Sequence, residues 1–178
     1  MRQPIVFALF QLVVSTGAIA QDSTSLPTFE ETLEAMQMTF QPPDGFVEVE
    51  PIPNRQMNYE KAYQLPNERF EVRYALRQHN FAFYKQIFEM TALNISGGRL
   101  PEYNGFDPDA VRQEFGADAG ATVMVPLGEE FGQDYAYCLL VYLHKTGTGD
   151  GYIFYLADDP ERIPDWMDPI FHNLRFQE

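Results

Sequence analysis

The chain has 178 residues, enough for one domain with a substantial hydrophobic core, and it carries 26 acidic residues against 12 Lys and Arg. The formal net charge of −14 makes nucleic acid and anionic membrane surfaces poor partners, whereas a basic protein or a cation would suit it better. The same acidity would also keep an exported protein in solution. Cys138 is the single cysteine, so an internal disulfide is excluded, and its apolar neighbours predict a buried side chain rather than a nucleophile.

The first twenty residues have the order of a secretory signal peptide. Arg2 precedes an apolar run over 5–14, and Ala18 and Ala20 form an A-x-A cleavage site before Gln21. The run is shorter than the roughly 20 residues of a membrane-spanning helix, which favours cleavage after Ala20 over a membrane anchor. We therefore expect export to the periplasm or the extracellular space, and three segments: a signal peptide over 1–20, a flexible leader over 21–28 and a single domain over 29–178.

A short helix and two extended segments are expected at the start of the domain. Thr28, with Glu31 three residues later, has the pattern of a capping box and predicts a helix over 29–38. Extended segments follow over 38–40 and 46–49, on either side of a Pro-Pro-Asp-Gly turn.

A β-hairpin is the clearest local signal, with strands over 59–65 and 70–77. In the second strand apolar residues alternate with mostly polar ones: Phe70, Val72, Tyr74 and Leu76 against Glu71, Arg73, Ala75 and Arg77. This period of two is typical of a half-buried strand, so we expect an antiparallel hairpin with one face in solvent.

Two helices are predicted in the middle of the chain. The first has an apolar stripe at helical spacing and ends before Gly97 and Gly98; the stripe consists of Tyr84, Ile87, Phe88, Thr91 and Ile95. The second has Asp107 as its N-cap, Pro108 at its first position and Gly116 after its end.

The last third of the chain predicts strands over 121–127, 135–144 and 152–157, then a Pro-rich helical segment over 164–171. Residues 135–143 are apolar on both faces, as in a central strand with layers on both sides. The sequence therefore predicts an α+β domain: a central antiparallel sheet of about six strands, covered by helices on both faces in an α/β/α sandwich.

The segment Met38-Thr39-Phe40-Gln41-Pro42-Pro43-Asp44-Gly45-Phe46, with the hairpin, helix, strands and terminal helix ending near Phe176, resembles the PsbP-like group. That group is similar in fold to the Ran-binding Mog proteins and includes photosystem subunits, exported lipoproteins and periplasmic immunity proteins. Its members usually bind proteins, so the resemblance implies a binding role and a protein partner. It carries over no site residue.

Catalytic and metal-binding motifs are not evident in the sequence. The three histidines, His79, His144 and His172, are scattered, and each is expected on the surface or at a strand end. The glycines at 147, 149 and 151 are expected to be turn residues, because a strand rather than a helix follows them. We predict no cofactor and no metal, with only a weak cation site assembled in the fold left open.

Aromatic residues offer the remaining functional signal. Tyr103, Phe106 and Phe131 fall in expected loops, where they either form a recognition surface or fold underneath the loops. Three hypotheses follow: an exported binding module such as an immunity-type inhibitor, a secreted hydrolase whose site is assembled only in the fold, and a ligand carrier with an apolar cleft. His144 beside an acid would favour the hydrolase.

Overall fold

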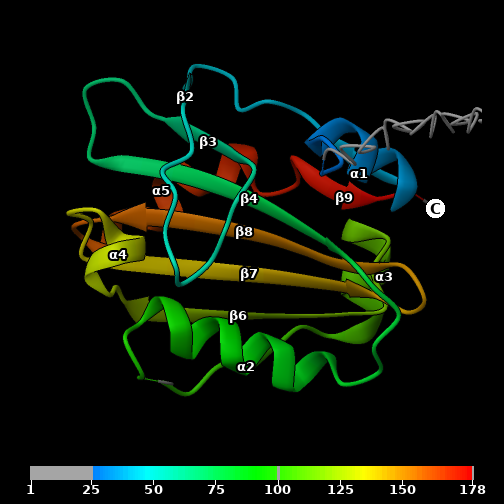
Figure 1. Cartoon of the computed structure of the whole chain (residues 1–178). Helices are drawn as coiled ribbons and strands as arrows, with labels where there is room; N and C mark the ends of the chain where they lie inside the picture. The colour runs from blue at the N-terminus through cyan, green and yellow to red at the C-terminus, as the bar shows by residue number, and fades with distance from the viewer. Residues whose placement is uncertain (1–25, 100, 178) are drawn as a thin grey trace, which may run out of the picture.

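The computed structural model describes residues 26–99 and 101–177, and within them the chain is an α+β fold with a seven-stranded antiparallel sheet (Figure 1). The strands lie in the order β2-β3-β4-β8-β7-β6-β5. Their bounds are β2 Val47–Val49, β3 Lys61–Gln64, β4 Phe70–Gln78, β5 Asn104–Gly105, β6 Ala119–Pro126, β7 Tyr137–Lys145 and β8 Gly149–Ala157. A separate two-stranded sheet pairs β1 (Met38–Phe40) with β9 (Leu174–Phe176). The sheet thus has one strand more than the six or so expected.

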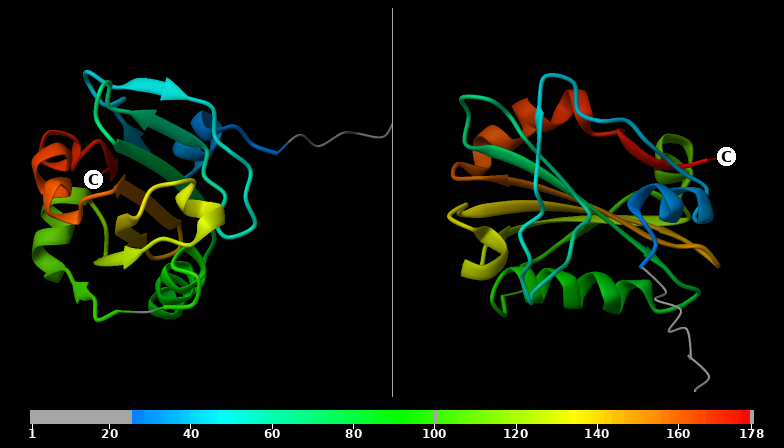
Figure 2. Two further views of the ribbon diagram at one scale, coloured as in Figure 1. Left: turned by 90° about the vertical axis from the view of Figure 1, so that its left-hand side faces the viewer. Right: turned by 45° about the horizontal axis from the view of Figure 1, so that its top comes forward.

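Five α-helices are found in the described residues: α1 (Phe29–Ala35), α2 (Tyr84–Ile95), α3 (Pro108–Phe115), α4 (Glu129–Gly132) and α5 (Ile163–Met167). Helix α2 runs beside β6 (Figure 1), whereas β1 packs next to α1 and β9 next to α3 (Figure 2). Helices α1, α3 and α5 contribute buried side chains to one apolar cluster, and α2 and α4 contribute to a second.

The predicted helix caps are confirmed. Thr28 and Glu31 form the capping box, although α1 ends at Ala35 rather than at residue 38. The Asp107 side chain accepts hydrogen bonds from two backbone N–H groups at the start of α3, and Gly116 ends that helix with a φ of 62°. The predicted terminal helix over 164–171 is divided into α5 and a 3₁₀ helix, Asp168–Ile170, and a further 3₁₀ helix, Pro160–Arg162, precedes α5. Pro169 has no N–H to continue an α-helical ladder, which accounts for the division after α5.

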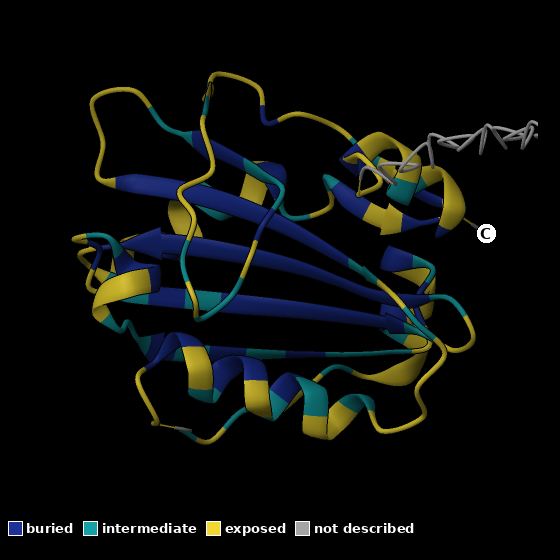
Figure 3. Cartoon of the chain, viewed as in Figure 1, coloured by how far each residue is buried: buried dark blue, intermediate teal, exposed yellow. Residues whose placement is uncertain are grey.

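The four longest strands, β4, β8, β7 and β6, form the interior of the sheet and are largely buried (Figure 3). All nine residues of β8 are buried, as expected for a strand with an apolar layer on each side. The hairpin of β3 and β4 is confirmed as antiparallel, but the prediction that one of its faces is in solvent was wrong.

Arg73 explains this difference, because its side chain is fully buried. Its Nε donates to Glu71 Oε1 at 2.5 Å, and its guanidinium also donates to the carbonyl oxygen of Phe131. The guanidinium carbon lies 4.7 Å from the ring centre of Tyr59 and 4.9 Å from that of Phe131. Glu71 and Arg73 on β4 therefore pair beneath α4 and the loop between β2 and β3 instead of facing water.

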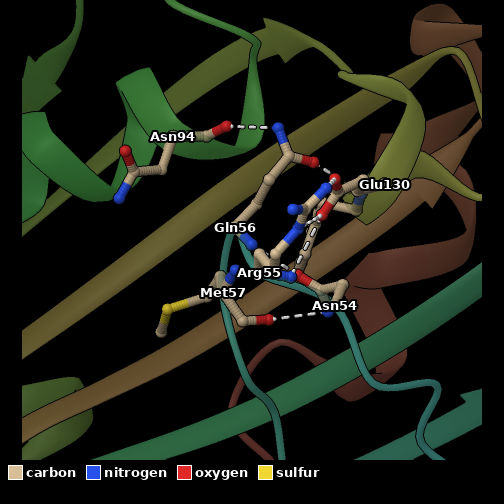
Figure 4. Close-up of polar contacts among 7 residues, drawn as sticks. Asn54, Arg55, Gln56, Met57, Asn94 and Glu130 are labelled. Carbon is tan, nitrogen blue, oxygen red and sulfur yellow. Dashed lines mark hydrogen bonds and ion pairs between the residues drawn. The ribbon is translucent and has the colours of Figure 1, made fainter.

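Gln56 holds the loop between β2 and β3 in place (Figure 4). Its side-chain amide donates to the carbonyl oxygen of Asn94 at 2.6 Å and accepts from the N–H of Phe131 at 2.6 Å. Beside it, Arg55 pairs with Glu130 at 2.6 Å on the surface. The loop between β2 and β3 thereby connects the last turn of α2 to α4.

Candidate functional site

The hairpin of β7 and β8 brings His144 next to Asp150. Its turn contains only residues 146–148, so β8 begins at Gly149, three residues earlier than predicted, and His144 pairs with Asp150 across the strands. Gly149 has a φ of 141°, and a Cβ there would lie 2.2 Å from the carbonyl oxygen of Arg77. Only glycine fits where β4, β7 and β8 converge.

Two imidazoles hold the buried Asp150 carboxylate. His144 Nδ1 lies 2.8 Å from Oδ1, and His79 Nε2 lies 2.6 Å from Oδ2. The Tyr152 hydroxyl is 3.3 Å from Oδ2. Asp150 is fully buried and His144 is 2% exposed, so the prediction of a surface or strand-end position for His144 holds only for the strand end. A buried carboxylate needs such donors because it has lost its hydration shell.

The hydrogen bonds assign the tautomer of His79. The N–H of Phe81 donates to His79 Nδ1 at 3.2 Å, so the ring proton of His79 is on Nε2 and points at Asp150. His144 contacts the same carboxylate through Nδ1, and its Nε2 has no hydrogen-bond partner among the described residues. An acid that orients an imidazole in this way is also a feature of hydrolase sites.

Five aromatic rings form a column from this buried cluster to the surface. Neighbouring rings are stacked, with centre-to-centre distances of 4.7 Å for Tyr84 and His144, 6.4 Å for His144 and His79, 4.9 Å for His79 and Phe81, and 5.3 Å for Phe81 and Phe83. Phe81 and Phe83 end the column and are 49% and 55% exposed. The two half-exposed, stacked rings form a contiguous apolar patch on the surface.

An aromatic pocket of about 240 Å³ adjoins the column. It lies between α2, β6 and the segment before α3, and five aromatic rings line it: Tyr84, Phe88, Tyr103, Phe106 and Tyr142. Two of the residues predicted as a recognition surface, Tyr103 and Phe106, therefore lie on one site, each partly buried. The Tyr103 hydroxyl donates to Glu89 at 2.7 Å, and this hydrogen bond raises the pKa of Tyr103.

The other site predictions have different outcomes. Phe131, the third expected recognition residue, lies in α4 and is fully buried against Tyr59 and Phe154, so its prediction as a loop residue was wrong. The apolar spacing around it was too short to reveal a four-residue helix. Cys138 is buried as expected, and burial raises the pKa of its thiol. The predicted cleavage residues Ala18, Ala20 and Gln21 lie outside the described residues.

The predictions for His172 and for the glycines of the β7–β8 hairpin can also be compared with the structure. His172 is half-exposed and lies 3.1 Å from Glu114, which agrees with its expected surface position. Gly147 is in the turn with a φ of 75°, whereas Gly149 and Gly151 are strand residues rather than turn residues. The sequence signal for the Asp150 cluster was therefore available: assigning the turn to residues 146–148 places His144 opposite Asp150.

Within residues 26–99 and 101–177, no group of three or more His, Cys, Asp or Glu side chains is arranged to hold a metal ion. The helices of the same residues are all too short or too polar to cross a membrane. Comparisons of the chain with protein-family models, with curated proteins and with solved structures found no match.

Proposed function

We propose that the chain is an exported binding protein that recognises a protein partner through an aromatic face. This face consists of the half-exposed Phe81 and Phe83, with Tyr103 and Phe106 beside them on the adjoining pocket. The observation that carries the proposal is the exposed, stacked pair of phenylalanines. Aromatic side chains are enriched at the centres of protein interfaces and contribute most of their binding energy.

The apolar area that Phe81 and Phe83 would bury is large enough to contribute to a specific interface. A phenylalanine buries about 150–250 Å² when covered, so two half-exposed rings would hide about 200 Å² in a complex. At about 25 cal/mol per Å², this gives a gross contribution of about 5 kcal/mol, before the costs of association are subtracted. Met90 on α2 is a further exposed apolar side chain, at 62%. The stack fixes both rings through His79, so little side-chain entropy remains to be lost on binding.

Charge, topology and resemblance agree with this proposal. The net charge of −14 favours a basic partner and would speed its encounter with the acidic chain. Helix residues in both core clusters are the basis for an α/β/α sandwich with helices on both faces of the sheet. That arrangement, export by a signal peptide and the PsbP-like resemblance are together typical of an accessory module, for example an immunity-type inhibitor.

A capture experiment with matched variants tests the function. The purified protein is immobilised beside a Phe81→Ser/Phe83→Ser variant and a Leu26→Ser/Val47→Ser control, which removes two other exposed apolar side chains. We expect one protein from the envelope or secreted fraction to be retained by the wild type and the control, and about 100-fold more weakly by the phenylalanine variant. Equal retention by all three proteins would contradict the proposal, and retention of only the chain itself would replace the partner by a second copy.

A secreted hydrolase is the second candidate, favoured by the 2.8 Å contact of His144 Nδ1 with Asp150. In this role the free Nε2 of His144 would take a proton from an attacking water, and Asp150 would stabilise the resulting imidazolium. The test is hydrolysis of p-nitrophenyl acetate and butyrate by the wild type, a His144→Gln variant and a His172→Gln control. Activity that disappears only in the first variant would favour the hydrolase, and equal rates in all three proteins would exclude it.

A further inference from the structure

We propose that the aromatic pocket binds a free aromatic amino acid. The pocket shares Tyr103 and Phe106 with the proposed recognition face, but this inference does not use Phe81 and Phe83, so loss of partner binding and loss of amino-acid binding can be measured separately. An apolar cavity of about 150 Å³ is large enough to hold benzene. The pocket, at about 240 Å³, therefore has room for one substituted ring with a short polar tail.

The walls of the pocket suit a flat ring. Phe88 lies between Tyr103 and Tyr142, with ring centres 4.9 Å and 5.5 Å away, and the Tyr103 ring stands at 74° to it. Aromatic rings prefer offset or edge-to-face partners at these distances, so a further ring finds a preformed site. The opposite wall consists of small residues, among them Ala119 and Ala121, which take up little space, whereas the side chain of Phe106 packs against Gly120.

Tyr142 belongs to the wall of the pocket, but its hydroxyl does not serve the ligand. The residue is 1% exposed and the hydroxyl oxygen is closed to solvent. The hydroxyl lies near Asp150, and burial, followed by the charge of Asp150, raises its pKa. Polar recognition in the pocket therefore depends on the charged residues that line it.

Two opposite charges also line the pocket and define the ligand class. Lys85 is exposed and has no ion pair among the described residues, so its ammonium is free for a carboxylate. Asp118 contributes a carboxylate, and the N–H of Thr146 at 2.9 Å lowers its pKa and keeps it charged. A cation and an anion on one pocket match the carboxylate and ammonium of an α-amino acid, with the side-chain ring in the aromatic interior.

The test is a titration of ¹⁵N-labelled protein followed by ¹H–¹⁵N NMR spectra. The probes are L-phenylalanine and L-tyrosine. Three analogues each lack one group: tyramine lacks the carboxylate, 3-(4-hydroxyphenyl)propionate lacks the ammonium and L-leucine lacks the aromatic ring. We expect both aromatic amino acids to shift the amides of residues 119–121 and 142, and each analogue to bind several-fold more weakly. No shifts with either aromatic amino acid, or equal binding of L-leucine, would overturn the proposal.

Variants then locate the site. Ala119→Leu fills the pocket and should abolish binding, and Lys85→Gln should weaken both amino acids about threefold, as expected for an exposed ion pair. Lys61→Gln, on β3, is the matched control and should bind as the wild type does. Wild-type affinity in both the Ala119 and Lys85 variants would show that the amino acid binds elsewhere and would refute the pocket.

Discussion

Replacing Asp150 should reveal how strongly the buried carboxylate holds the sheet end together. In Asp150→Ala, the ring N–H groups of His79 and His144 lose an acceptor that now lies 2.6 Å and 2.8 Å away. Hydrogen bonds to a charged group contribute about 1.5–3 kcal/mol each, and breaking a buried charge cluster typically costs about 3–5 kcal/mol. We therefore expect a loss of about 4 kcal/mol, which lowers the Tm by about 8–16 °C for a chain of this size.

Asp150→Asn keeps the shape of the side chain but removes its negative charge. The asparagine oxygen can accept from His79 Nε2, while its NH₂ group donates to His144 Nδ1 once the His144 proton moves to Nε2. His79 has no such freedom, because the Phe81 N–H requires an unprotonated Nδ1. This variant should therefore lose only about 1–2 kcal/mol and show the Nε2–H tautomer of His144.

The measurement is urea unfolding of the wild type and both variants, with ¹⁵N chemical shifts of the imidazoles to report the tautomers. Asp158→Asn is the surface control: Asp158 pairs with Arg69 at 2.9 Å but is 47% exposed, so its loss should be within about 1 kcal/mol. An Asp150→Ala variant that loses less than about 1 kcal/mol, or equal losses in the alanine and asparagine variants, would refute the reasoning.

Three further predictions concern single contacts. Gly149→Ala should lower the free energy of unfolding in urea by at least about 2 kcal/mol, because the new Cβ meets the Arg77 carbonyl. Gly147→Ala, whose Cβ has no atom within 4 Å, should lower it by about 1 kcal/mol, and equal losses would contradict this reasoning. Gln56→Ala should lower the free energy of unfolding by about 1–3 kcal/mol, because the Phe131 N–H loses its acceptor. Asn94→Ala keeps the backbone oxygen that Gln56 contacts and should lower it by less than about 0.5 kcal/mol. Asp118 has a lowered pKa in the folded chain, chiefly through the Thr146 N–H, so its charge stabilises the fold above the unfolded pKa of about 3.9. The Tm difference between wild type and Asp118→Asn should therefore be constant above about pH 5 and shrink as the pH falls below about 3.9, and a difference that persists at pH 2 would contradict this.

Local patterns in the sequence predicted the elements well, because those signals depend on neighbouring residues alone. The capping box at Thr28 and the Asp107-Pro108 start of α3 are set within one helical turn, and both were found as expected. The apolar stripe of α2 likewise predicted three of its buried residues, Phe88, Thr91 and Ile95, whereas Tyr84 and Ile87 are only partly buried.

What the sequence did not predict depends on contacts between distant segments. Glu71 and Arg73 have the spacing of a solvent face, yet α4, about 60 residues later, covers them and turns the pair into a buried one. Alternation reports polarity along one strand and cannot say which loop will fold over it. The same limitation placed Phe131 in a loop, since only its contacts with Tyr59 and Phe154 make it a core residue.

The aromatic column depends both on neighbouring residues and on contacts between distant segments. Phe81 and Phe83 are exposed in a segment with no regular structure, yet His79 fixes the positions of their rings. His79 is in turn held by Asp150, which is distant in the sequence but lies on β8, the strand that pairs with β4. A mutation at the buried carboxylate should therefore change the exposed face without touching it, through the Phe81 N–H bond to His79. If Asp150→Ala stays folded but loses the partner as strongly as Phe81→Ser/Phe83→Ser does, the cluster positions the recognition surface; if it keeps wild-type affinity, the cluster only stabilises the sheet.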